Sequence, residues 1–145
     1  MTDAPPLGRP EPGGTAKKRL RLTLEFDGSD FLGWQRQAGS ERTVQATIES
    51  AFAALPGEHS SVLGAGRTDA GVHALALVAH VDTTWDQPNE KLRLALNAHL
   101  PPDVKVVAVA DAAPDFQAQF DCLYRRYLYR MRVMRDDPRG MAIQR

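Results

Sequence analysis

The order of apolar patterns along this chain constrains its fold more than any other feature. Apolar residues at helical spacing predict a helix over 44–55, with Thr43 as its N-cap, and a second helix that begins near Pro88. Apolar runs and alternating patterns predict strands at 20–26, 60–63, 72–81, 104–110 and 123–133. The resulting order, β-α-β-β-α-β-β, predicts an α+β fold with a mostly antiparallel sheet and helices on one face.

Composition narrows the class of protein. The chain has 145 residues, which suits one domain, and 43% of them are hydrophobic, enough for a core. Its formal net charge is zero, which argues against a generic nucleic-acid binder. We expect no transmembrane segment and no secretory signal. The single cysteine, Cys122, excludes an internal disulfide and agrees with a reducing cytoplasm.

Charge and flexibility are unevenly distributed. Residues 1–16 are rich in Pro and Gly and predict a flexible tail. Basic residues cluster in 17–21 and again in 125–135. Solvated strand faces are the favoured interpretation of both clusters. Contacts to phosphates are the alternative, with Lys17, Lys18 and Arg19 as candidates.

The segment 64–74 is rich in glycine and joins two apolar runs. It places Asp69 two residues after Arg67. A neighbouring cation favours the ionised form of a carboxylate, and an ionised, positioned Asp can act as a nucleophile or a base. The alternative is a surface ion pair in an ordinary turn, which contributes little.

Two further segments are candidates for the same site, the loop 31–37 and the last predicted strand. In that strand Arg125, Tyr127 and Tyr129 share one face, which offers a stacking surface for an unpaired base and charges for phosphates. Packing against neighbouring strands is the alternative. The histidines have no metal-ligand spacing, so we predict no metal, and we expect His73 to be hydrogen-bonded within the fold.

The segment 66–74 resembles the catalytic signature of the bacterial tRNA pseudouridine synthase A family. Other segments resemble the same family in the same order: 26–28, 33–37, 43–45, 96–101 and 124–129. The resemblance implies the ferredoxin-like half of a pseudouridine synthase fold. It also implies an isomerase that converts uridine to pseudouridine in the anticodon stem-loop of tRNA, with no cofactor and no metal.

The resemblance also implies roles for residues. Asp69 is the expected nucleophile, and it attacks the ribose or the uracil ring or assists elimination at the ribose. Arg67 is expected to pair with Asp69 and to help hold the flipped nucleotide, while Tyr127 stacks on the target uracil. The remaining expected substrate contacts are Gln35, Arg36, Thr68 and Arg126. The expected partner is tRNA, the complete enzymes form homodimers, and the expected location is the cytoplasm.

The chain also departs from the family. The resemblance covers about 17–135, which is the N-terminal catalytic half of a pattern nearly twice as long, so 136–145 is interpreted as a linker to a second half. Gln119 stands where the family usually carries Arg, and an amide cannot replace a guanidinium in an anion contact. Three interpretations stay open: a piece of a longer enzyme, a half that assembles with a second chain, and a non-catalytic RNA-binding module.

Overall fold

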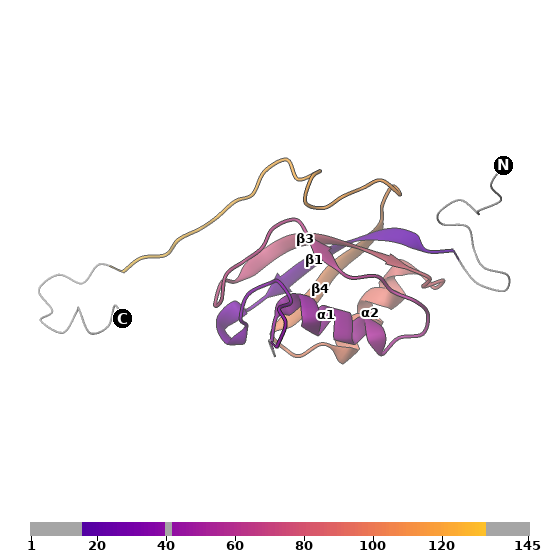
Figure 1. Ribbon diagram of the computed structural model, residues 1–145, viewed down its shortest axis with the longest axis horizontal. Coiled ribbons are helices and arrows are strands. Elements are labelled where there is room, and N and C mark those ends of the chain that lie inside the picture. Colours follow the sequence, from indigo (N-terminus) through magenta and orange to yellow (C-terminus); the bar gives the residue numbers. More distant parts are fainter. Residues whose placement is uncertain (1–15, 40–41, 133–145) are drawn as a thin grey trace, which may run out of the picture.

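A computed structural model describes residues 16–39 and 42–132 (Figure 1). The predicted linker over 136–145 and the predicted tail, apart from Ala16, lie outside the described residues. The regular elements are β1 (Lys18–Phe26), the short 3-10 helix η1 (Gly28–Asp30), α1 (Val44–Ala53), β2 (Leu63–Gly64), β3 (Ala74–Thr83), α2 (Asn89–His99) and β4 (Val104–Asp111).

The strands form one antiparallel sheet in the order β2-β3-β1-β4. Both helices lie against the same face of this sheet (Figure 1). The βαββαβ order with this strand arrangement is that of the ferredoxin-like motif. The predicted fold class, an antiparallel α+β fold with helices on one face, is therefore confirmed.

The alternation of apolar and polar residues in β1 decides which face of the sheet carries the core. Leu20, Leu22 and Leu24 are completely buried, whereas Arg21 and Glu25, which point to the other face, are exposed. The helices supply the opposite wall of the core with Val44, Ile48, Ala51, Phe52, Leu92 and Leu96. Burial of these side chains is the main stabilising contribution to the fold.

The helix boundaries follow the predicted signals. The Thr43 side chain accepts a hydrogen bond from the Ala46 amide, so Thr43 is the N-cap of α1 as expected. Pro88 precedes α2, and its carbonyl accepts from the Leu92 amide. Farther along α2, the Asn97 side chain donates to the Val106 carbonyl and accepts from the Val106 amide. Asn97 therefore satisfies main-chain groups on the outer edge of β4, an edge strand.

The segment after β4 returns over the sheet face opposite the helices (Figure 1). The Arg19 guanidinium donates to the Phe116 carbonyl at 2.6 Å, and the Ala118 amide donates to His80 Nδ1 at 3.1 Å. His80 is 2% exposed, and this burial lowers the pKa of its imidazole below the ordinary value. Residues 112–118 thus cover part of a face that the helices leave open.

The Arg19–Asp82 ion pair on this face predicts a pH dependence of stability. Arg19 donates to both carboxylate oxygens of Asp82, at 2.8 and 2.9 Å, and these hydrogen bonds hold the pKa of Asp82 below its ordinary value of 3.8. A carboxyl whose pKa is lower in the folded state stabilises the fold above its unfolded value, and this contribution is lost as the pH falls through the folded value.

Asp82→Asn is therefore expected to lower the free energy of unfolding at pH 7 and to flatten its decline below about pH 4. Urea unfolding measured between pH 7 and pH 2.5 checks this prediction. Asp86→Asn, at an exposed position with no ion pair among the described residues, is the matched control. If the free energy of unfolding falls equally between pH 4 and pH 2.5 in the wild type and in Asp82→Asn, the prediction is contradicted.

The last predicted strand, over 123–133, is absent from the described residues, which carry no strand after β4 as far as residue 132. The segment leaves the body as an extended arm (Figure 1). Its apolar side chains are exposed, with Leu123 at 94% and Met131 at 87%. An alternating pattern makes a strand only beside another strand, and none lies next to this segment in the described part of the chain.

Candidate functional site

The glycine-rich segment forms the loop between β2 and β3, and main-chain hydrogen bonds hold it in place. The Ala65 amide donates to the Val78 carbonyl at 2.7 Å, where the loop begins beside β3. The Trp34 amide donates to the Thr68 carbonyl at 3.0 Å, and the Gly71 amide donates to the Phe31 carbonyl at 3.3 Å. The loop that carries Asp69 is therefore paired with the segment after η1.

Two glycines make this pairing possible. Gly33 has φ +103°, and a Cβ at that position would lie 2.7 Å from the Thr68 carbonyl oxygen. A Cβ on Gly28 would lie only 1.9 Å from the Val72 carbonyl oxygen. Only glycine permits so close an approach of two main chains. The two segments could not pack in this way with any other residue at these positions.

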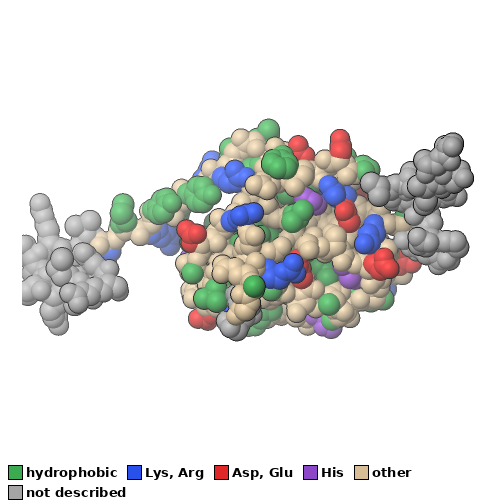
Figure 2. Space-filling model, in the orientation of Figure 1, with side chains coloured by type: hydrophobic (Ala, Val, Ile, Leu, Met, Phe, Trp, Pro, Cys, Tyr) green, Lys and Arg blue, Asp and Glu red, His purple; other side chains and the backbone are tan. Residues whose placement is uncertain are grey.

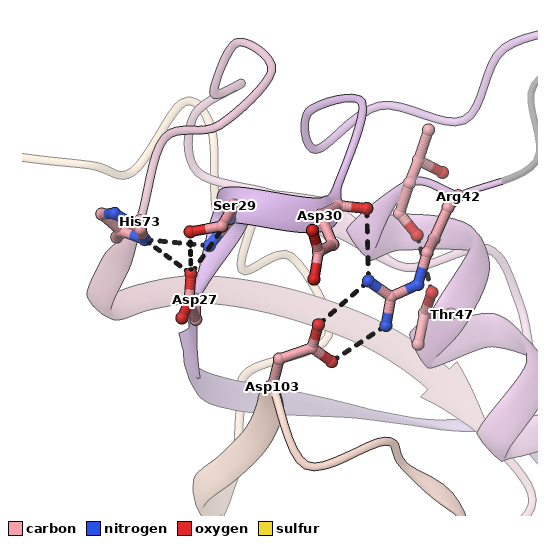
Figure 3. A network of polar contacts seen from close by, with 9 residues as sticks. Asp27, Ser29, Asp30, Arg42, Thr47, His73 and Asp103 are labelled. Atoms are coloured by element: carbon pink, nitrogen blue, oxygen red, sulfur yellow. Dashed lines mark hydrogen bonds and ion pairs between the residues drawn. The ribbon is translucent and has the colours of Figure 1, made fainter.

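His73 forms a further link between the loop and the end of β1 (Figure 3). The Gly28 amide donates to His73 Nδ1 at 3.0 Å, so the neutral ring carries its proton on Nε2. Asp27 Oδ1 lies 3.1 Å from the same nitrogen and accepts from the amide and hydroxyl of Ser29. The hydrogen bonds from Ser29 lower the pKa of Asp27. The prediction that His73 is hydrogen-bonded within the fold is confirmed.

Replacing His73 tests this link. His73→Ala leaves the Gly28 amide without its acceptor, and we expect it to destabilise the fold by about 1–2 kcal/mol. His73→Asn offers an amide oxygen near the Nδ1 position and should restore part of that loss. Thermal unfolding followed by circular dichroism measures both variants, with His99→Ala on the exposed end of α2 as the control. Identical midpoints for His73→Ala and the wild type would show that the link contributes nothing.

Arg42 anchors the segment after η1 from the other side (Figure 3). Its guanidinium donates to both carboxylate oxygens of Asp103, at 2.9 and 3.0 Å, and to the Asp30 carbonyl at 3.2 Å. The same guanidinium stacks 4.0 Å above the Phe31 ring. The hydrogen bonds to Asp103 raise the pKa of Arg42. The segment that pairs with the loop is thereby joined to the residue that precedes β4.

Asp69 and Arg67 are both exposed at the surface of this braced loop. Within the described residues they form no ion pair with each other, although the resemblance implies one. Thr68 lies between them, and its Oγ1 is buried without a hydrogen-bond partner. The loop therefore presents one carboxylate and one guanidinium to solvent, both available to a ligand.

A pocket of about 160 Å³ lies beside the loop. Of the predicted site residues, Arg67 and Gln35 line it, and Asp69, Thr68, Tyr127 and Arg126 do not. The remaining lining residues are Trp34, Gln45, Leu63, Gly64, Gln117, Gln119 and Phe120. Phe120 and Gln117 were not predicted as site residues. They reach the pocket because residues 112–120 return over the sheet, and no local sequence pattern indicates that return.

Arg36, one of the expected substrate contacts, is bonded to other residues of the chain. Its guanidinium forms an ion pair with Glu49 of α1 at 2.5 Å, and its amide donates to the Gln45 side chain. Gln45 is buried and also donates to the Val62 carbonyl. Arg36 and Gln45 thus join the loop 31–37 to α1 and to the residue before β2.

The residues Arg125, Arg126 and Tyr127 lie near the start of the extended arm. Arg125 donates from Nε to the Ala65 carbonyl at 2.9 Å and also from Nη2. Its side chain lies over Gly66, where an added Cβ would be 3.1 Å from Nε. Arg126 is exposed, and Tyr127 is 61% exposed. Arg125 therefore ties the arm to the start of the Asp69 loop, a contact that the sequence patterns did not indicate.

Charges of both signs are interspersed over the visible face of the body, while apolar side chains follow the arm (Figure 2). Lys17 lies 4.0 Å from Glu58, and Arg19 pairs with Asp82, so two members of the first basic cluster face carboxylates. The described residues contain no group of three or more His, Cys, Asp or Glu side chains that could hold a metal. No helix in the described ranges is long and apolar enough to cross a membrane.

Comparison with known proteins decides the family. A family profile described as tRNA pseudouridine synthase matches residues 23–124, from β1 to the start of the arm. The chain belongs to the tRNA pseudouridine synthase family. The match includes the whole Asp69 loop, the segment that braces it and the pocket, so the family resemblance seen in the motifs is confirmed.

The similarity to individual members of the tRNA pseudouridine synthase family supports the same membership. The tRNA pseudouridine synthase A of Sinorhizobium fredii is 48% identical over 130 residues, which are 88% of this chain and 52% of that protein. The corresponding protein of Agrobacterium fabrum is 51% identical over 116 residues, covering 78% and 43%. That of Neisseria meningitidis is 48% identical over 113 residues, again covering 78% and 43%. The chain thus spans about half the length of these relatives.

Proposed function

We propose that this chain is the part of a tRNA pseudouridine synthase that carries the nucleophile, Asp69, and that the enzyme isomerises uridine in the anticodon stem-loop. The observation that supports this most is the exposed Asp69 carboxylate on a loop that main-chain hydrogen bonds hold rigid. Positioned carboxylates of this kind act as nucleophiles. The names of the relatives agree with a tRNA substrate.

In the proposed reaction the bond between uracil N1 and the ribose breaks, the ring turns, and C5 bonds to the same ribose carbon. The proton lost from C5 is balanced by the proton that N1 gains. Asp69 attacks the ribose or the uracil, or assists elimination at the ribose. Every route is an isomerisation, so it consumes no cofactor. A paired or stacked uridine must first be flipped out, which costs a few kcal/mol.

Arg67 and Tyr127 are proposed to offset the cost of flipping. Arg67 is exposed beside Asp69 and has no ion-pair partner among the described residues, so its charge is available to the RNA backbone. Stacking of uracil on Tyr127 contributes about 1–3 kcal/mol. Arg125 holds the arm with Tyr127 at the start of the loop. Thr68, Gln35, Arg36 and Arg126 are proposed as further substrate contacts, and the working enzyme is proposed to be a cytoplasmic homodimer.

Formation of pseudouridine on unmodified tRNA tests the proposal. The tRNA is incubated with this chain alone and with this chain plus the second half of a full-length relative, and pseudouridine is detected by carbodiimide labelling. Labelling at anticodon-arm uridines in either reaction supports the proposal. Saturable tRNA binding without labelling in both reactions would overturn it in favour of a non-catalytic RNA-binding module.

A further inference from the structure

The pocket beside the Asp69 loop contains hydrogen-bonding groups that the protein itself does not use. Within residues 16–39 and 42–132, the Trp34 indole N–H, the side-chain amides of Gln35 and Gln119 and the Arg67 guanidinium have no hydrogen-bond partner. All four residues line the same pocket. By contrast, the Gln45 side-chain amide already accepts from the Arg36 main-chain amide and donates to the Val62 carbonyl. The pocket therefore has unused donors and acceptors that a ligand can satisfy.

Apolar surface surrounds these groups. Phe120 is 78% exposed at the rim, and Leu63 is 44% exposed. Gly64 lies against the Trp34 indole, and a Cβ there would come within 2.8 Å of Cε2. Any larger residue at position 64 would overlap the indole ring and narrow the pocket. Aromatic surface next to unsatisfied amides is the combination that recognises unpaired bases, through stacking and hydrogen bonds to their edges.

The volume of the pocket and the charge of its lining limit the class of ligand further. The volume of about 160 Å³ is below the roughly 300–1,000 Å³ of pockets for drug-sized ligands, so a single ring suits it better than a whole nucleotide. Among the described residues, Arg67 is the one charged residue in the lining, and none of them contributes a carboxylate there. Guanidinium and indole donors favour a base with carbonyl acceptors, and each amide supplies both a donor and an acceptor. A pyrimidine base meets these requirements.

The proposed reaction requires the reacting base to contact Asp69, and Asp69 does not line the pocket, whereas Arg67, two residues earlier in the loop, does. Two residues of extended chain span at most about 7 Å, which is within reach of adjacent nucleotides. We infer that the pocket holds a second, unpaired pyrimidine next to the uridine that reacts, with Arg67 between the two bases. This inference rests on the proposed function and adds a subsite to it.

The inference is tested with this chain by measuring RNA binding after a substitution in the protein, after removal of one base from the RNA, and after both changes together. The probe is a fluorescein-labelled hairpin with an anticodon-arm sequence, and a series of hairpins carries one abasic nucleotide at each loop position. Binding is measured by fluorescence anisotropy for the wild type, Phe120→Ala and Gln119→Leu. We expect Phe120→Ala to weaken binding of the intact hairpin about tenfold, because one stacking contact is lost.

The expected signature is that this loss disappears for one abasic hairpin, the one that lacks the base beside the target uridine. Gln119→Leu should show a smaller loss that disappears in the same hairpin. The matched controls are Leu123→Ala, at an exposed apolar position of the same segment, and Gln87→Leu, at an exposed amide; neither residue lines the pocket.

Losses that are equal for every abasic hairpin, losses as large in the controls, or no saturable binding by the wild-type chain would each overturn the inference. Circular dichroism confirms that each variant is folded. The binding experiment and the pseudouridine assay fail independently. If pseudouridine forms but no abasic hairpin abolishes the binding loss of the variants, the subsite is disproved and the proposed activity stands. If one abasic hairpin abolishes that loss but no pseudouridine forms, the proposed activity is disproved and the subsite stands.

Discussion

Asp69→Asn is expected to abolish pseudouridine formation by the complete enzyme while tRNA binding stays at the wild-type level. The amide has almost the shape of the carboxylate but lacks its charge and its nucleophilicity. We expect turnover to fall by at least about three orders of magnitude. Carbodiimide labelling of tRNA measures turnover, and fluorescence anisotropy measures binding.

The matched control for Asp69→Asn is Asp30→Asn. Asp30 is also an exposed aspartate near the loop, and its side chain has no hydrogen bond among the described residues. It should retain full turnover. Turnover within a few-fold of the wild type in Asp69→Asn would remove Asp69 as the nucleophile, and loss of tRNA binding by the same variant would point to a structural role instead.

Gly28→Ala is expected to destabilise the fold strongly. The added methyl group would lie 1.9 Å from the Val72 carbonyl oxygen and 2.6 Å from its carbon, and both atoms belong to the main chain. No side-chain rotation can relieve this overlap, so the loop and the end of β1 must separate. We expect a loss of about 3 kcal/mol or more and a fall in the unfolding midpoint of at least about 10 °C.

Gly66→Ala is the comparison for Gly28→Ala, because it adds the same methyl group within the Asp69 loop, against which Gly28 packs. Its Cβ would meet only the exposed Arg125 side chain, at 3.1–3.4 Å, and that side chain can move aside. Gly66→Ala should therefore shift the midpoint by only a few degrees. Differential scanning calorimetry of both variants checks the prediction, and a Gly28→Ala midpoint equal to that of Gly66→Ala would show that the close approach is not needed.

Local sequence patterns predicted most of the fold because each of these elements depends on interactions that leave a pattern in its own sequence. Leu20, Leu22 and Leu24 alternate with polar residues because one face of β1 packs on the helices, and Thr43 caps the helix that follows it. The segment 123–133 shows the limit of this reasoning. It is rich in the aromatic residues that favour strands, but a strand also requires a neighbouring strand, which the described residues do not supply there.

The candidate site was predicted in part. Glycine content and the Arg67–Asp69 spacing indicated the loop, which the structure presents at the surface beside a pocket. The loop 31–37 was expected at the same site, and main-chain hydrogen bonds join it to the Asp69 loop. The close approach at Gly28 and Gly33 was not predicted, because it depends on where distant segments meet. The placement of Arg36 against Glu49 was missed for the same reason, since an isolated cation gives no sign of its partner.

The brace of the Asp69 loop has a practical consequence for engineering. Apart from those of the His73 and Arg125 side chains, the hydrogen bonds that shape this loop join peptide groups, including those of Ala65, Thr68 and Gly71. A combinatorial library at Arg67, Asp69 and Ala70 would therefore vary the side chains at the surface while the backbone conformation of the loop is kept. Most members of such a library should be soluble and cooperatively melting, which makes this turn a natural starting point for redesigning what the scaffold acts on.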